Sequence, residues 1–149
     1  MNKAAIGEEK NPASQSTSLK HNMFIIWKPE YNIGIPIIDE HHRGIVSTIN
    51  SLYFAMQNNY VKNLLNPIHD MMKDYTRIHF EIEEMILENA GSPHAQSHHG
   101  LHLELSSQLS RTGKNSLLDS DPYPFMDFMK QWWINHICCE DLILKKLLD

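Results

Sequence analysis

Apolar residues recur along most of the chain at steps of three and four, which is the period of an amphipathic α-helix. No stretch shows the sustained two-residue alternation that is typical of a half-buried strand. Four segments carry the helical pattern, and short polar loops separate them. This arrangement predicts an all-α fold, an antiparallel up-down-up-down four-helix bundle with an N-terminal arm. The expected helices run from about 39 to 57, from about 61 to 89, from Ser92 to Gly113, and from Asp121 or Tyr123 toward the end of the chain.

Two segments precede the first predicted helix. Residues 1–22 are polar and cannot bury enough apolar surface to offset the entropy lost on ordering, which predicts a flexible tail. Residues 23–149 are therefore expected to form the four-helix domain. Its first part, residues 23–37, is punctuated by proline and glycine and predicts an irregular arm that packs onto the bundle. The residues expected to make this contact are Phe24, Ile26, Trp27 and Tyr31.

Composition narrows the class of protein. A length of 149 residues is typical of one domain, and a net charge of -5 gives no reason to expect a nucleic-acid partner. No apolar run approaches the ~18 residues that span a bilayer, and residues 1–22 lack the apolar core of a signal peptide. The only cysteines, Cys138 and Cys139, are adjacent, which excludes a disulfide framework. We therefore expect a cytoplasmic protein without a membrane partner.

Five of the ten histidines fall on the apolar, inward stripes of the predicted helices. A single buried histidine on such a stripe would be interpreted as an ordinary core residue. Five unpartnered imidazoles, however, would each cost ~1–3 kcal/mol on burial, so a metal centre is the better interpretation. The remaining histidines lie beside the stripes or in the tail, and those beside the stripes are expected on solvated faces. The inward set is His42, His79, His98, His102 and His136; the others are His21, His41, His69, His94 and His99.

Carboxylates near these histidines decide how many metal ions the site can hold. Glu83 follows His79 by four residues and shares its helix face, whereas Glu81 and Glu84 lie off that face and are expected in solvent. Imidazole with carboxylate, and no paired thiolate motif, suits Fe, Mn, Zn or Cu.

The carboxylate on the last predicted helix is ambiguous. Glu140 follows His136 by four residues, as a regular helix requires for two side chains on one face. Asp141 follows His136 by five residues and would share its face only through a π-bulge. Spacing alone therefore favours Glu140.

Four motifs occur in order along the chain. They are Trp27 followed by YNIGIPIIDEHH, then HFEIEE, then a Pro93-x4-His98-x3-His102 spacing, and finally WINHICCED. Over about residues 24–145 the chain resembles the hemerythrin family, and its bacterial single-domain members most of all. The resemblance implies two Fe ions with a bridging oxo or hydroxo group, and it selects Asp141 over Glu140. The implied metal ligands are His42, His79, Glu83, His98, His102, His136 and Asp141.

The resemblance implies an unequal division of these ligands, with three histidines on one iron and His42 and His79 on the other. Two octahedral metals offer twelve positions, and the five imidazoles, two bridging carboxylates and one bridging oxygen fill eleven. One position is left for a small ligand. Apolar residues on adjacent turns are expected to exclude water from it. The candidates are Ile45, Phe80, Trp132, Trp133 and Ile137.

The function expected from this resemblance is reversible dioxygen binding for storage, delivery or scavenging, with dioxygen as the partner and no enzymatic turnover. Five histidines against two carboxylates favour binding over a di-iron oxidase or peroxidase, because the ferritin-like di-iron enzymes use more carboxylates. An oxygen- or iron-sensing module is the third hypothesis. It is disfavoured because sensor versions usually carry an output domain, for which we expect no room here.

Overall fold

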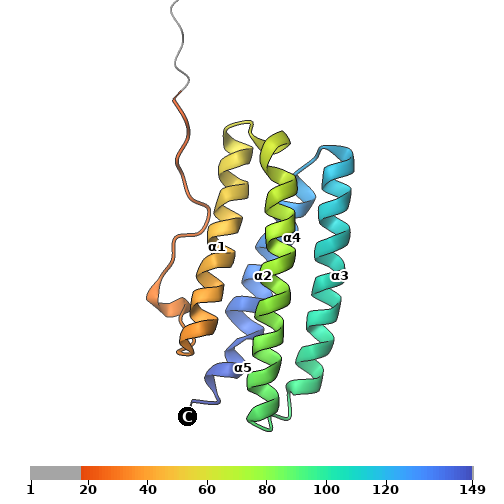
Figure 1. Cartoon of the computed structure of the whole chain (residues 1–149). Helices are drawn as coiled ribbons and strands as arrows, with labels where there is room; N and C mark the ends of the chain where they lie inside the picture. Colours follow the sequence, from red (N-terminus) through yellow and green to blue (C-terminus); the bar gives the residue numbers. More distant parts are fainter. Residues whose placement is uncertain (1–17, 149) are drawn as a thin grey trace, which may run out of the picture.

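The computed structural model describes residues 18–148, and within this range the protein is all-helical without a strand. Four long helical stretches run in alternating directions and pack side by side, which confirms the predicted four-helix bundle (Figure 1). No helix of the described part is long and apolar enough to cross a membrane. The elements are η1 (Pro29–Tyr31), α1 (Pro36–Gln57), α2 (Val61–Asn89), α3 (Ala95–Asp119), α4 (Tyr123–Gln131), η2 (Trp132–Glu140) and α5 (Leu142–Lys145).

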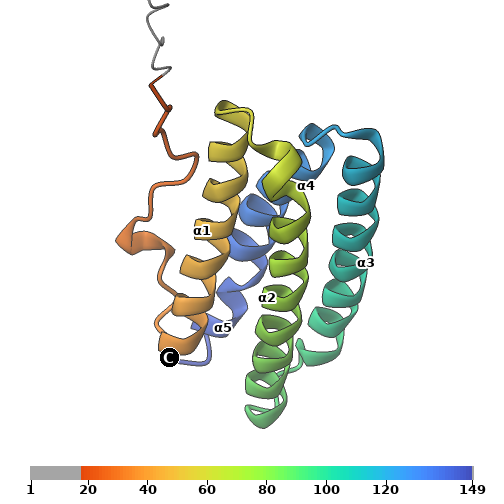
Figure 2. The ribbon, with the colours of Figure 1, turned by 45° about the horizontal axis from the view of Figure 1, so that its top comes forward.

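The fourth helical stretch of the bundle, residues 123–145, consists of three consecutive segments, and we call it the fourth strut. The other three struts are α1, α2 and α3. Between α4 and α5 the chain forms η2, a π-helical stretch, where the sequence pattern alone predicts one regular helix. The last residues of this strut lie beside the start of α1 (Figure 2). A small apolar cluster closes this end of the bundle. Its buried members are Ile33, Ile38, Leu87 and Leu144.

Helix α1 begins at Pro36, a few residues before the predicted start. Proline suits the first turn because its missing N–H would have no partner there. Both carboxylate oxygens of Asp39 accept backbone hydrogen bonds, from Ile33 at 2.7 Å and Gly34 at 3.1 Å. Gly34 has φ +95°, which a side chain would disfavour. Asp39, in the first turn of α1, therefore holds the preceding loop against this helix.

The arm packs on the bundle through three of the four predicted residues, and Ile26 is the exception. Ile25 is buried, whereas Ile26 is 64% exposed. Phe24 is partly exposed, but its ring lies 5.7 Å from the ring of Tyr53 on α1. Trp27 and Tyr31 are half-buried, as part of the contact that was expected. The side chains of an extended chain point alternately to opposite sides, so seating Ile25 turns Ile26 outward. Of the predicted tail, residues 1–17 lie outside the described residues, and 18–22 have no regular secondary structure.

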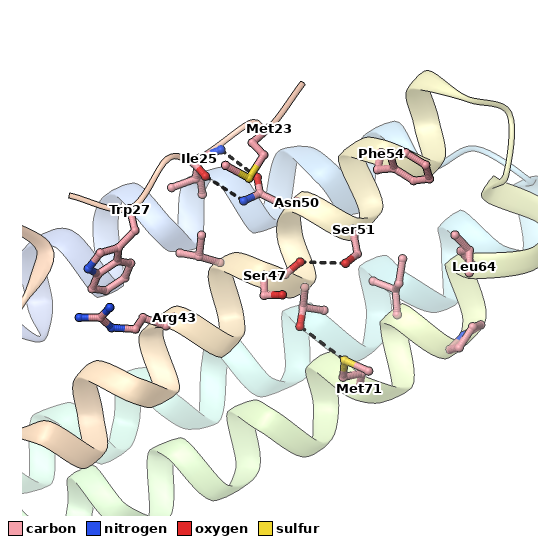
Figure 3. Close-up of a pocket in the computed structure, with 14 residues that line it drawn as sticks. Met23, Ile25, Trp27, Arg43, Ser47, Asn50, Ser51, Phe54, Leu64 and Met71 are labelled. Atoms are coloured by element: carbon pink, nitrogen blue, oxygen red, sulfur yellow. Dashed lines mark hydrogen bonds between the residues drawn. The ribbon is translucent and has the colours of Figure 1, made fainter. Parts of the chain in front are cut away.

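Asn50 holds the arm by three hydrogen bonds. Its side-chain oxygen accepts from the backbone N–H of Phe24 at 2.9 Å. The same oxygen accepts from the backbone N–H of Ile25 at 2.9 Å, and Nδ2 donates to the Ile25 carbonyl at 2.8 Å (Figure 3). A largely apolar groove of about 660 Å³ lies between the arm, α1 and α2. The arm therefore depends on one amide side chain as well as on Ile25.

Helix α3 continues through Gly113 and ends at Asp119, so the predicted end at Gly113 is wrong. The following residue, Ser120, has φ +53° and provides the left-handed turn at the helix end. Gly113 is needed for packing, because a Cβ built there would overlap the imidazole of His69 on α2.

His69 is buried, with 2% of its surface exposed, so its predicted place on a solvated face is also wrong. Its ring meets the ring of Phe125 edge-on, with centroids 5.4 Å apart. Burial is the main cause that lowers the pKa of His69 below its ordinary value. The absence of a side chain at Gly113 provides the space for this ring.

Replacing Asn50 by alanine is expected to lower the free energy of unfolding by about 1–3 kcal/mol, because three exposed or part-buried hydrogen bonds of roughly 0.5–1.5 kcal/mol each are lost. Thermal unfolding measures the loss, and faster hydrogen exchange at the Phe24 and Ile25 amides locates it. Ser51→Ala is the control, since that hydroxyl bonds only to its own helix at Ser47. Unchanged exchange at both amides would contradict the proposed role of Asn50.

Gly113→Ala is expected to destabilise the protein by about 1–3 kcal/mol, because the rigid imidazole of His69 must move. Gly100→Ala on the same helix is the matched control, because a Cβ there meets nothing within 4 Å. It should stabilise by roughly 0.5–1 kcal/mol through helix propensity. Chemical denaturation of both variants measures the difference, and equal effects would refute the packing argument.

Candidate metal centre

All seven side chains predicted as ligands meet in the interior of the bundle. Each of the four struts contributes at least one of them, and their relative exposures range from 0% to 3%. They come from α1 (His42), α2 (His79, Glu83), α3 (His98, His102), η2 (His136) and the junction before α5 (Asp141).

The seven side chains form two overlapping groups. Within each group the potential ligand atoms lie within 4.8 Å of one another. Glu83 and Asp141 belong to both groups, and the histidines divide unequally between them. The first group contains His98, His102 and His136; the second contains His42 and His79.

Glu83 presents one oxygen to each group of histidines. Its Oε2 lies 3.1 Å from Nε2 of His102 and 3.3 Å from Nε2 of His98. Its Oε1 lies 3.2 Å from Nε2 of His79 and 4.0 Å from Nε2 of His42. A carboxylate oriented in this way has the geometry of a bridge between two neighbouring cations.

Asp141 is oriented in the same way from the opposite strut. Its Oδ1 lies 3.1 Å from Nε2 of His136 and 3.4 Å from Nε2 of His98. Its Oδ2 lies 3.1 Å from Nε2 of His42 and 3.8 Å from Nε2 of His79. The centre therefore contains two carboxylates that each face both groups.

The π-helical segment η2 turns Asp141 inward. The Asp141 N–H donates to the His136 carbonyl at 2.9 Å, a five-residue step. Asp141 is fully buried, whereas Glu140 is exposed, so the structure disagrees with the spacing argument for Glu140. The same π-helical segment leaves Cys139 exposed, and Leu144 after it is buried.

Several buried atoms at the centre have no hydrogen-bond partner, which tests whether the residues fit a metal. An unpartnered buried polar atom costs ~1–3 kcal/mol, and most of the atoms concerned face other members of the cluster. Nitrogen and oxygen donors of this kind suit iron among the first-row metals. The unpartnered atoms that face the cluster are Nε2 of His79, His102 and His136, Oε1 of Glu83 and Oδ1 of Asp141; the outward Nδ1 atoms of His42 and His79 also have no partner.

The electrostatics favour a cation. Burial opposes ionisation of Asp141, but the neighbouring imidazoles of His42, His79 and His98 outweigh it and hold the pKa of Asp141 well below its ordinary value. The pKa of Glu83 is also lowered, against both burial and the charge of Asp141, by the surrounding imidazoles. Two anionic carboxylates therefore lie together in a nearly water-free interior, and they require positive charge beside them.

The pKa values of two histidines of the first group are shifted in opposite directions. Burial lowers the pKa of His136 to about 4, which keeps its imidazole neutral and able to coordinate. Burial also opposes protonation of His98, but the carboxylates of Asp141 and Glu83 prevail and raise its pKa to about 9. At His98 a proton and a metal ion therefore compete for the same position between imidazole and carboxylates.

Glu84 was predicted to be solvated, and this prediction is wrong. Its Oε1 lies 2.8 Å from Nδ1 of His102, and its Oε2 lies 2.8 Å from Nδ1 of His99. His99 itself is exposed, as predicted. The contacts join α2 to α3, so spacing within one helix carried no signal for them.

Aromatic side chains contact several of the clustered histidines. The ring of Phe80 stacks on that of His102 with centroids 3.8 Å apart and an interplanar angle of 8°. Trp132 meets Phe80 edge-on at 6.0 Å. All five predicted residues are buried, namely Ile45, Phe80, Trp132, Trp133 and Ile137.

A family model described as the Hemerythrin HHE cation binding domain matches residues 33–148. The chain belongs to the hemerythrin family. The matched range includes all seven clustered residues and confirms the resemblance, although Trp27 of the first motif lies before it.

Curated relatives named bacteriohemerythrin are similar over most of the chain. The protein from Stenotrophomonas maltophilia is 29% identical over 118 residues, which are 78% of this chain and 76% of the relative. Identity and coverage are the same for the protein from Pseudomonas aeruginosa. The protein from Clostridium acetobutylicum is 27% identical over 122 residues, covering 78% of this chain and 95% of the relative. Proteins of three bacterial species are thus similar in sequence to this chain over most of its length.

Asp141→Ala is expected to reduce bound iron from two ions per chain to at most one, because both groups lose a shared carboxylate. Glu140→Ala removes the same charge from the exposed neighbour and should leave iron binding unchanged. Metal analysis of the two purified variants after loading measures the difference. Loss of iron in Glu140→Ala but not in Asp141→Ala would show that the wrong carboxylate had been assigned.

Proposed function

We propose that this hemerythrin-family protein holds two iron ions in the bundle and binds dioxygen reversibly, as an oxygen store, carrier or scavenger of the cytoplasm. The observation that carries the proposal is the pair of carboxylates that face both histidine groups. His98, His102 and His136 would hold one iron, and His42 and His79 the other. When bound, the two irons would supply reversible electron exchange with dioxygen.

The division of histidines supports binding of a small ligand. Glu83 and Asp141 would serve both irons equally, so the group with two histidines provides fewer protein ligands than the group with three. A coordination position for dioxygen would then be available on the side of His42 and His79. The curated relatives are named bacteriohemerythrin, which agrees with this assignment.

The surrounding residues support reversibility. Ile45 from α1 and Phe80 from α2 are almost fully buried next to turns that carry the candidate ligands. Trp132 of the fourth strut is also buried. They exclude water and outside proton donors, which would otherwise convert dioxygen binding into turnover. The donor set points the same way, since five imidazoles outnumber two carboxylates. A non-enzymatic role is therefore the better proposal, and an oxidase or peroxidase is its alternative.

The test is to load the full chain with iron, reduce it and expose it to air. An oxygen-dependent visible absorption band that appears in air and disappears under vacuum, over repeated cycles, is the expected result. Irreversible bleaching with release of hydrogen peroxide would favour the oxidase. One zinc ion per chain in the purified protein would refute both di-iron functions.

A further inference from the structure

Glu84 lies next to Glu83 in sequence but faces away from the centre, toward α3. Its two carboxylate oxygens contact different histidines, Nδ1 of His102 and Nδ1 of His99, each at 2.8 Å. The first of these histidines belongs to the buried cluster, and the second is 53% exposed. Glu84 thus connects the centre to the surface of α3.

His102 has a different partner on each ring nitrogen. Its Nε2 faces the cluster and lies 3.1 Å from Glu83, whereas its Nδ1 meets Glu84. An ionised carboxylate can only accept a hydrogen bond, so this contact places the ring hydrogen on Nδ1. The lone pair is then on Nε2, the nitrogen that faces the centre.

This arrangement is specific to one histidine. Within residues 18–148, His102 is the one member of the cluster whose outward nitrogen meets a carboxylate. The Nδ1 atoms of His42 and His79, by contrast, have no hydrogen-bond partner. The stacked ring of Phe80 fixes the plane of the His102 imidazole, and Glu84 fixes its rotation within that plane.

We propose that Glu84 is a positioning residue of the metal centre, with His99 as the clamp that holds it. The inference rests on the proposed di-iron site. Glu84 orients His102 with Nε2 free to coordinate, and its negative charge stabilises the more oxidised irons. Carboxylates in this position raise the basicity of a ligand imidazole, and their loss typically weakens metal binding by 10–100-fold.

The His99 clamp explains why an accessible carboxylate stays in place. The side chain of Glu84 is 22% exposed, and with one bond alone it would rotate toward water. Its second oxygen accepts from His99, which lies one residue after His98 and three before His102 on the same helix. One helix therefore provides both the ligand and the group that holds its partner.

Three variants of the full iron-loaded chain separate geometry from charge. Glu84→Ala removes both the acceptor and the charge. Glu84→Gln keeps an oxygen that can accept from His102 but removes the charge. Glu81→Gln removes the same charge from the exposed face of α2, where the side chain is 65% exposed beside Arg77. The measurements are the rate of iron release to a chelator, the midpoint potential of the centre and the thermal unfolding temperature.

The expected result is that Glu84→Ala releases iron about 10–100-fold faster than the unmodified chain. Glu84→Gln should release it at nearly the unmodified rate, with a higher midpoint potential because a nearby anion is gone. Glu81→Gln should change neither quantity. Similar unfolding temperatures of the metal-free Glu84→Ala variant and metal-free wild type would show that the fold is not the cause.

Iron release from Glu84→Ala at the unmodified rate would overturn the positioning role. An equal rise in potential for Glu84→Gln and Glu81→Gln would overturn the local charge effect, since net charge alone would explain it. Both results require an unmodified chain that holds two irons. An unmodified chain that binds no iron would instead refute the proposed function, and this inference with it.

Discussion

The structure depends on two carboxylates buried together. Glu83 and Asp141 lie among five imidazoles, with no exposed surface on either side chain. Two anions cannot remain in such an interior unless cations or protonated groups lie beside them, because desolvation costs several kcal/mol per ion. All four struts must therefore stay in register, since each provides an imidazole or carboxylate to the same small volume. The packing of the bundle and the assembly of the site therefore depend on each other.

The backbone of the fourth strut departs from a regular α-helix to satisfy this constraint. A regular helix would place Glu140 near His136 and direct Asp141 elsewhere. Instead η2 makes five-residue steps, and Asp141 reaches the centre while Glu140 remains in solvent. The π-helix is a less favourable backbone conformation and is rare. It persists here because the carboxylate that it delivers faces both histidine groups.

Packing between helices decides several positions that no single helix can. His69 is buried because Gly113, far away in sequence, has no side chain. Glu84 is held against α3 by two histidines and is only 22% exposed. Asn50 holds an arm that begins before the first helix. In each case the stabilising contact is made with a residue on another element. From the sequence alone, the residue would be interpreted as a surface position.

The sequence by itself determined the four-helix bundle and the inward set of histidines. Both follow from the helical period, which acts between residues three and four apart and can be read locally. Glu83 was found for the same reason, since it shares a face with His79. Only the tertiary structure placed Asp141 inward by geometry, buried His69 and paired Glu84 with His102. Those outcomes depend on a distorted turn or on contacts across helices, which local periodicity does not contain.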